Sequence, residues 1–233
     1  MPRPYVTINA AMSCDGKIAT SSREKLRLST VKDGEIIDRL RRDADAILVG
    51  GTTLTNDNPR LVLRYEENRR HRVLQGLPEN PAKVAISSRC DIDPESNFLQ
   101  VGTANKYVFT TARATEENME RVRTHATVIQ AATERVDIPS LLETLHGRGI
   151  RKLLVEGGGS TNFEFIRHRM VDELRIAIAP AIIGGADAPT LVDGAGFSPS
   201  DAADLQILGV EVLGEMIIVR YKFKHILGTI EDA

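Results

Sequence analysis

The chain has 233 residues, which is enough for one sizeable domain with a full hydrophobic core. Its 30 basic and 32 acidic residues give a net charge of −2, without the basic excess typical of nucleic-acid-binding proteins. No apolar run approaches the roughly 20 residues that span a bilayer, and the N-terminus lacks the apolar core of a signal peptide. We therefore expect one soluble, cytoplasmic domain over residues 1–233 that binds neither nucleic acid nor membrane.

The cysteines and histidines give no sign of a metal or nucleophile site. Cys14 and Cys90 lie far apart, and no metal-ligand spacing surrounds either of them. We expect two free thiols in a reducing cytoplasm. The five histidines are scattered among polar residues, which is typical of surface positions. The sequence therefore predicts no metal site and no cysteine–histidine pair.

Strand-like and helix-like segments alternate along most of the chain. A strand is expected at 5–11, followed by a helix whose start at Thr30 is marked by Asp33, in the spacing of a capping box. The nearly all-apolar run 45–50 is typical of a strand buried on both faces of a parallel sheet. Further strands are expected at 82–87, 106–111, 126–130 and 152–156, and further helices at 115–123, 138–146 and 162–169.

The end of the chain follows a different pattern. Strands are expected at 171–179, 205–213 and 216–224, and the two-residue link between the last two implies an antiparallel hairpin. Together the patterns predict an α/β fold, with a mainly parallel mixed sheet flanked by helices and an antiparallel C-terminal hairpin. The remaining segments, 64–80 and 184–200, are expected to be loops, the first of them charged, exposed and mobile.

A glycine-rich segment follows the expected strand at 152–156. It contains Glu156, Gly157, Gly158, Gly159, Ser160 and Thr161. Glycines let the backbone approach a phosphate, and a helix N-terminus offers free N–H groups. The segment fits neither the dinucleotide fingerprint nor a P-loop, yet it predicts an anion site beside Glu156, at the edge where open α/β sheets bind ligands. The alternatives are a plain tight turn and a Glu156 that only caps a helix or pairs with a lysine.

Two other loops have features of binding sites. The loop at 50–64 carries small residues, hydroxyls, the turn Asp57-Asn58-Pro59 and Arg64, whose planar donor fork suits a phosphate. An ordinary strand-to-helix loop is the alternative. The loop at 13–19 contains the tight turn Asp15-Gly16, for which a plain hairpin is the more economical interpretation.

A fourth loop contains Ser87, Ser88 and Arg89 after an expected parallel strand. These residues are suited to hold a ribose phosphate, and direct charge pairing with a 2′-phosphate would favour NADPH over NADH. In a parallel sheet several of the four loops open onto one edge and would line one cleft. Because the sequence shows no Ser-His-Asp set and no pair of buried carboxylates, the expected chemistry needs a cofactor.

In their order, these motifs resemble the riboflavin-biosynthesis pyrimidine reductases, which share the dihydrofolate reductase fold. The resemblance covers about residues 4–224 and is carried by Ser13-x-Asp15-Gly16-Lys17, the segment 45–64, Glu156-Gly157-Gly158 and Pro180-x-x-x-Gly184-Gly185. It implies a homodimer that uses NADPH to reduce the ribosylamino side chain of a pyrimidine 5′-phosphate to a ribitylamino chain. The hydride would pass from nicotinamide C4 to C1′ of the sugar.

The resemblance also implies roles for individual residues. The implied cofactor contacts are Thr53, Asp57, Ser87, Ser88, Arg89, Gly157, Gly158, Gly159, Ser160 and Thr161. The implied substrate contacts are Arg41, Leu61, Arg64 and Glu156, with Arg27 as a less specific match. Arg64 is the candidate for the substrate phosphate. Asp57 is the expected catalytic residue, because it is the only acidic side chain in a predicted cleft loop near the nicotinamide, where it would orient a donor or assist proton transfer.

The absence of two motifs from the sequence narrows the range of candidate substrates. Many bacterial reductases are fused to a zinc deaminase with His-x-Glu and Pro-Cys-x-x-Cys motifs, and neither motif occurs here. The chain therefore resembles the stand-alone archaeal and fungal reductases, which act on the 2,5-diamino pyrimidinone before deamination. Three alternatives stay open: a reductase of the deaminated 5-amino uracil compound, a dihydrofolate-type pterin reductase, and a non-catalytic nucleotide-binding module.

Overall fold

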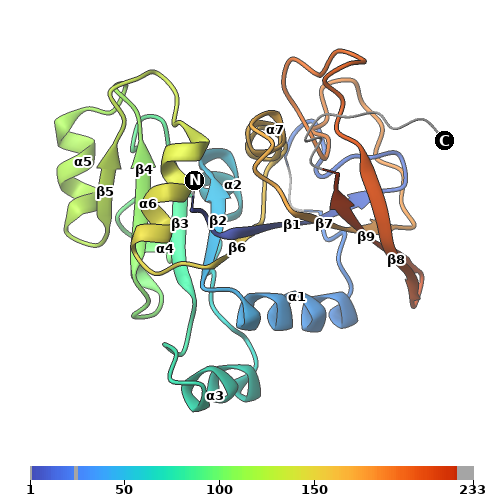
Figure 1. The fold of residues 1–233 in the computed structure, drawn as a ribbon, viewed down its shortest axis with the longest axis horizontal. Coiled ribbons are helices and arrows are strands. Elements are labelled where there is room, and N and C mark those ends of the chain that lie inside the picture. Colours follow the sequence, from blue (N-terminus) through green and yellow to red (C-terminus); the bar gives the residue numbers. More distant parts are fainter. Residues whose placement is uncertain (1, 24–25, 225–233) are drawn as a thin grey trace.

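The structure is a computed structural model that describes residues 2–23 and 26–224. One nine-stranded sheet runs through it in the order β5-β4-β3-β2-β6-β1-β7-β9-β8 (Figure 1). Its strands are β1 (Tyr5–Ser13), β2 (Ala46–Gly50), β3 (Ala82–Ile86), β4 (Lys106–Thr110), β5 (Thr127–Gln130), β6 (Lys152–Val155), β7 (Glu173–Ala179), β8 (Leu205–Leu213) and β9 (Met216–Phe223). The helices are α1 (Val31–Asp43), α2 (Gly51–Asp57), α3 (Glu66–Leu74), α4 (Asn97–Gln100), α5 (Glu116–Arg123), α6 (Ile138–Gly147) and α7 (Gly159–Arg167).

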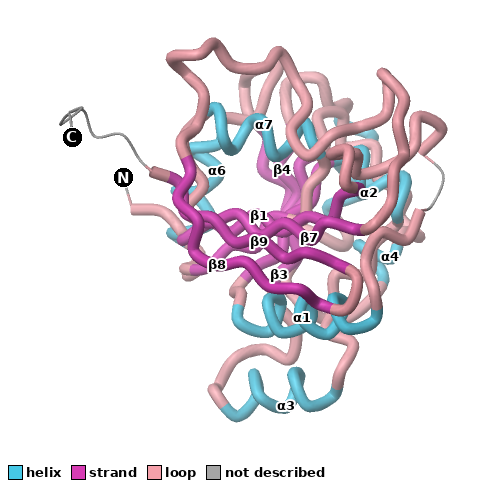
Figure 2. The backbone as a smooth tube through the Cα atoms, turned by 90° about the vertical axis from the view of Figure 1, so that its right-hand side faces the viewer, coloured by secondary structure: helices cyan, strands magenta, loops and turns pink. Residues whose placement is uncertain are grey.

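The sheet is mixed, as the sequence predicts. Strands β1 to β7 pair with one another in parallel, whereas β9 pairs antiparallel with both β7 and β8. Helices α6 and α7 lie on one side of the sheet, and α1 and α3 lie on the other (Figure 2). None of the helices in the described ranges is both long and apolar enough to cross a membrane.

Local sequence signals account for the main elements. All five residues of β2 are buried, which explains why this strand is apolar on both faces. At the start of α1 the side chain of Thr30 accepts a hydrogen bond from the backbone N–H of Asp33, at 3.2 Å. At the start of α6 the side chain of Asp137 accepts from the N–H of Ser140, at 2.9 Å. Both helix starts therefore lie where the sequence predicts them.

The expected loop at 64–80 is wrong, because α3 lies within it. Its charged and polar residues are partly buried: Asn68 donates to the buried carboxylate of Asp38 at 2.8 Å. Arg72 is 2 % exposed and donates to the carbonyl oxygens of Arg42 and Ala44, at 2.8 and 2.6 Å. These carbonyls belong to the last turn and the C-cap of α1, where the helix itself provides no donors for them. The charge in this segment therefore packs α3 against the end of α1 instead of marking an exposed loop.

Two smaller differences lie near the glycine-rich segment. Helix α7 begins at Gly159, three residues before the expected start at 162, so that Ser160 and Thr161 belong to its first turn. The turn at Asp15-Gly16 does not join two strands of a hairpin. Instead Lys17 forms an isolated antiparallel bridge with Thr190, in the loop at 184–200.

A buried lysine holds α4 against the sheet. Lys83 lies on β3 and is 0 % exposed. Its Nζ donates to the carbonyl oxygens of Val101 at 2.6 Å, Phe98 at 3.2 Å and Asn97 at 3.3 Å, so that it satisfies the C-terminal end of α4. Burial, followed by the positive charges of Lys106 and Arg41, lowers the pKa of Lys83 to about 7.

Replacing this lysine is expected to change the pH dependence of stability. Because the pKa of Lys83 is lower in the folded protein, the unfolded chain binds more protons between about pH 7 and about pH 10. The wild-type free energy of unfolding therefore gains up to about 1.4 kcal/mol per pH unit from this residue as the pH rises. The variant Lys83→Met lacks this gain. Urea denaturation should therefore show that the wild type becomes more stable relative to Lys83→Met as the pH rises from about 7 to about 9.

The matched control is Lys152→Met, which removes an exposed lysine from the neighbouring part of the sheet. Its free energy of unfolding should follow that of the wild type at each pH. A difference between wild type and Lys83→Met that stays constant with pH would contradict the lowered pKa of Lys83.

Candidate functional site

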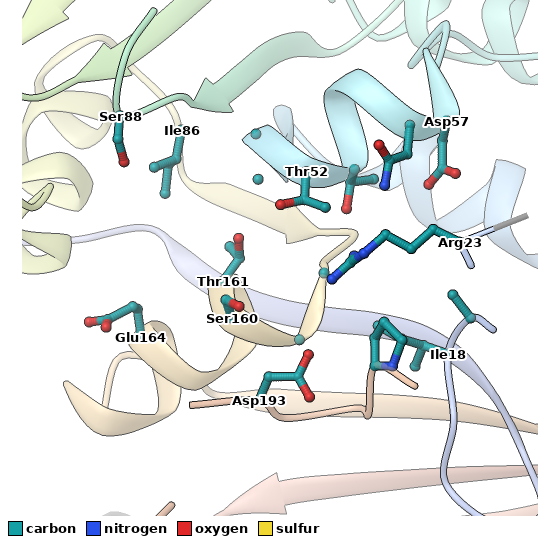
Figure 3. Close-up of a pocket in the computed structure, with 18 of the residues that line it drawn as sticks. Ile18, Arg23, Thr52, Asp57, Ile86, Ser88, Ser160, Thr161, Glu164 and Asp193 are labelled. Carbon is teal, nitrogen blue, oxygen red and sulfur yellow. The ribbon is translucent and has the colours of Figure 1, made fainter. Parts of the chain in front are cut away.

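A pocket of about 850 Å³ opens at the carboxyl ends of the parallel strands. Its walls come from the loops and helix starts that follow β1, β2, β3, β4, β5 and β6, and from the loop at 184–200. Figure 3 shows α2 and α7 on its two sides, with Thr52 and Asp57 on the first and Ser160 and Thr161 on the second. This is the edge at which open α/β sheets bind ligands.

Two helix N-termini face this pocket. Helix α2 follows β2 directly with Gly50 as its N-cap, and α7 follows β6 with Gly158 as its N-cap. Glycine has no side chain to cap a helix, so no side chain at these two positions occupies the first N–H groups. Free N–H groups and the positive end of the helix dipole attract an anion. The pocket residues at the starts of both helices therefore provide donors suited to a phosphate.

The glycines are also required by packing. A Cβ on Gly50 would lie 2.1 Å from Oγ1 of Thr161, and a Cβ on Gly159 would lie 2.4 Å from the carbonyl oxygen of Thr190. Gly157 has a φ of 87°, and its carbonyl oxygen accepts the N–H of Gly50 at 2.8 Å. The Gly157–Gly158 peptide bond is cis. The glycine-rich segment is therefore a tight turn that borders a ligand-sized pocket.

Most of the cofactor candidates line the pocket. Those in its walls are Thr53, Asp57, Ser88, Gly158, Gly159, Ser160 and Thr161. The other three are placed differently. Gly157 lies behind the wall against Gly50, Ser87 is 8 % exposed, and the exposed Arg89 follows Ser88 away from the pocket lining.

Four substrate candidates, Arg41, Leu61, Arg64 and Glu156, lie outside the pocket lining, whereas Arg27 belongs to it. Arg41 on α1 forms a two-pronged ion pair with Glu156, with Nε–Oε1 and Nη2–Oε2 distances of 2.8 and 2.7 Å. Burial lowers the pKa of Arg41, but the charge and hydrogen bonds of Glu156 outweigh it and the net shift is upward. Leu61 is buried, and the backbone N–H of Arg64 donates to Asp38. Arg41, Glu156 and Arg64 are therefore tied to α1, outside the pocket lining, although Glu156 itself begins the glycine-rich segment.

This second group adjoins the pocket through two short segments. Leu61 follows Asp57 by four residues, and Glu156 directly precedes the glycines. Sequence reasoning missed several pocket residues that carry charge: Arg23, Arg113, Glu134, Arg135, Glu164 and Asp193. Arg113 and Arg135 come shortly after expected strands at 106–111 and 126–130. The rule that nominated the residues after 82–87 would have found them as well.

The motif at 13–17 ties two loops together. The Asp15 carboxylate accepts the N–H groups of Ile183 and Gly184, at 3.1 and 2.7 Å, and the hydroxyl of Ser13. The hydrogen bond from Ser13 and those two N–H groups lower the pKa of Asp15 to about 2. Lys17 donates to the carbonyl oxygen of Ala188 at 2.9 Å. These residues therefore shape the wall that Ile18 and Pro189 contribute to the pocket.

The sheet order and the pocket at its carboxyl edge define an α/β protein of the pyrimidine reductase fold. A pyrimidine reductase-like protein from Corynebacterium diphtheriae superposes with a TM-score of 0.83 at 24% identity, covering 95% of this chain and 92% of that one. The α/β fold class expected from the sequence, with a mainly parallel mixed sheet and an antiparallel C-terminal hairpin, is thereby confirmed.

Sequence comparison identifies the family. The RibD C-terminal domain profile matches residues 4–219, and the chain belongs to this family. It is 40% identical over 223 residues to the 2,5-diamino-6-ribosylamino-4(3H)-pyrimidinone 5′-phosphate reductase of Archaeoglobus fulgidus, covering 96% of this chain and 100% of the relative. The protein of that name from Methanothermobacter thermautotrophicus is also 40% identical, with 95% and 99% covered. These relatives confirm the family resemblance of the sequence motifs.

The Arg41–Glu156 pair is expected to contribute strongly to stability. The two side chains are only 16% and 12% exposed, so Arg41→Ala leaves the Glu156 carboxylate buried without its partner. We expect a loss of about 3 kcal/mol in the free energy of unfolding. The control is Arg42→Ala, whose ion pair with the half-exposed Asp43 should be worth at most about 1 kcal/mol. Chemical denaturation of both variants makes the comparison, and equal losses would contradict this account of the pair.

Proposed function

We propose that this chain is a 2,5-diamino-6-ribosylamino-4(3H)-pyrimidinone 5′-phosphate reductase of riboflavin biosynthesis. The observation that carries the proposal is the 40% identity, over nearly the whole of both chains, to two proteins of that name. A cytoplasmic location fits this biosynthetic role.

We propose NADPH as the cofactor, bound in the pocket between α2 and α7. The chemistry of the pocket fits a dinucleotide: two helix starts with free N–H groups, hydroxyls on Thr53, Ser160 and Thr161, and cationic side chains in the wall. The packing around Gly50 and Gly159 excludes a Cβ at both positions, which keeps backbone amides at the surface of the pocket. When bound, the cofactor supplies the hydride.

The chain's own residues would act mainly by positioning. Asp57, at the end of α2, faces the pocket and is the proposed catalytic residue, which orients a donor or holds a proton at the reacting centre. The substrate is proposed to lie between Asp57 and Glu156, the point at which the pocket adjoins the group around α1. Glu156 would then accept hydrogen bonds from the substrate while Arg41 keeps its carboxylate oriented. Holding the two reactants in line supplies several kcal/mol of rate enhancement.

Arg64 and Arg27 are competing candidates for the substrate phosphate. Arg64 is exposed, and a Cβ on Gly34 of α1 would lie 3.8 Å from its Nη1, so its guanidinium reaches the group around α1. Arg27 lines the pocket itself. We favour Arg64, because it lies with Glu156 and Leu61 on the proposed substrate side.

We also propose that the chain forms a homodimer through its C-terminal hairpin. Strand β8 lies at the edge of the sheet, and an edge strand presents unpaired backbone groups. Its side chains include Ile207, Val210 and Val212, which are 62%, 59% and 75% exposed, and Ile217 of β9 is 44% exposed beside them. An exposed apolar patch on a sheet edge is suited to contact with a second copy.

The substrate assignment is tested by NADPH oxidation with purified protein. We expect oxidation with the 2,5-diamino pyrimidinone phosphate, and slower oxidation with the deaminated 5-amino uracil compound. Asp57→Asn should lower kcat with the diamino substrate by at least about 100-fold, because a positioned acid–base group contributes that much. Arg64→Ala should instead raise KM for the phosphorylated substrate.

Each alternative has its own result in this assay. Faster oxidation with the deaminated compound would reassign the substrate, and oxidation with dihydrofolate alone would make the protein a pterin reductase. Binding of NADPH without oxidation by any of these compounds would leave a nucleotide-binding module. An Asp57→Asn protein with unchanged kcat and KM would remove Asp57 from catalysis.

The dimer is tested by sedimentation. The wild type should sediment as a dimer, and Val212→Lys should sediment as a monomer because a charge enters the apolar contact. Gln206→Lys is the matched control, since it adds the same charge to the same strand without removing an apolar side chain. A monomeric wild type, or equal behaviour of the two variants, would contradict an interface on this hairpin.

A further inference from the structure

Two arginines in the pocket wall have no individual role in the function proposed above. Arg113 follows β4 and Arg135 follows β5, and both line the pocket. Strands β4 and β5 are the two that extend the sheet outward from β3, which Ser88 follows. The three side chains therefore come from the ends of three successive strands and form one side of the pocket, which we call the outer side.

The chemistry of the pocket changes from one side to the other. Asp57 and Ile18 lie on one side of Figure 3, Ser88 and Glu164 lie on the other, and Thr52, Ser160 and Thr161 lie between them at the starts of α2 and α7. A dinucleotide with its diphosphate at the helix starts and its nicotinamide toward Asp57 extends its adenosine to the outer side. Its adenine-bearing ribose then lies among Ser88, Arg113 and Arg135.

The guanidinium groups on the outer side are only weakly engaged by protein carboxylates. Nε of Arg113 lies 3.7 Å from Oε2 of Glu134, and Nη1 of Arg135 lies 3.5 Å from Oε1 of Glu164. Both distances exceed those of charge-assisted hydrogen bonds. The two arginine side chains are 46% and 78% exposed, so their donors can reach a ligand.

The carboxylates on this side raise the opposite possibility, since an acidic residue that accepts the ribose 2′-hydroxyl selects NADH whereas an arginine accommodates a 2′-phosphate. Glu164, however, already accepts two hydrogen bonds from Arg167, at 2.6 and 3.2 Å. Arg167, which lies outside the pocket lining, thus offsets the charge of Glu164, and Arg113 and Arg135 face only one further carboxylate in the lining, that of Glu134. The remaining positive charge favours a phosphate over a hydroxyl.

We propose that Arg113 and Arg135 select a cofactor that carries a phosphate on its adenosine ribose. Arg89, which the sequence nominated for this task, is outside the pocket lining, and its backbone carbonyl accepts a hydrogen bond from Asn118. The proposal rests on the proposed function, because it takes the ligand of the pocket to be a nicotinamide dinucleotide. What it adds to that function is the identity of the two residues that select the cofactor.

Binding of two small nucleotides tests the selection without any turnover. Isothermal titration calorimetry measures Kd for 2′,5′-ADP, which carries the 2′-phosphate, and for 5′-AMP, which lacks it. The wild type should bind 2′,5′-ADP more tightly, and Arg113→Ala/Arg135→Ala should lose about 100-fold of that preference, about tenfold for each charged hydrogen-bond donor. The matched control is Arg89→Ala/Arg121→Ala, which removes two exposed positive charges that lie outside the pocket lining.

The outcomes separate the two proposals. Loss of the preference in Arg113→Ala/Arg135→Ala and its retention in Arg89→Ala/Arg121→Ala would support the selection. Retention in the first variant, loss in the control, or a wild type without preference would overturn it, and the reductase assignment would stand if substrate-dependent oxidation of the cofactor persists. A wild type that binds neither nucleotide and oxidises no cofactor would overturn both.

Discussion

The arrangement of the pocket depends on the close approach of two strand ends. At the carboxyl ends of β2 and β6 the backbone N–H of Gly50 donates to the carbonyl oxygen of Gly157, and a Cβ on Gly50 would collide with Thr161. Because β2 and β6 are paired neighbours, this contact sets the starts of α2 and α7 side by side. Any larger residue at Gly50 would separate the two helix starts that form the centre of the pocket.

The fold is largely predictable because its elements carry strong local signals. Buried parallel strands such as β2 are apolar along their whole length, and the helix starts at Thr30 and Asp137 are marked by side chains that cap them. The failure at 64–80 has a physical cause. There Asn68 and Arg72 are buried because their partners, Asp38 and the carbonyls at the end of α1, are distant in sequence. From composition alone, such polar and charged residues are predicted to be exposed.

The sequence predicts where the site lies better than it predicts which residues line it. Parallel strands bring Asp57, Ser88 and Gly158 to one edge, so a rule of strand ends finds them. That rule cannot tell which of the side chains after a strand points into the pocket. The pocket lining contains Arg113 and Arg135 but not Arg89, the arginine that the sequence suggested. It also cannot foresee that Arg41 and Glu156, two candidates for substrate contact, bind each other.

The hydrogen bonds of Asp15 and Lys17 have a mechanical consequence. Asp15 holds Ile183 and Gly184, Lys17 holds Ala188, and the N–H of Ile18 donates to the carbonyl of Pro189 at 2.9 Å. The loop after β1 and the loop at 184–200 are thus joined at several points along their length. Widening the mouth of the pocket on this side therefore requires both loops to swing out together, so entry of a ligand there is governed by one joint displacement.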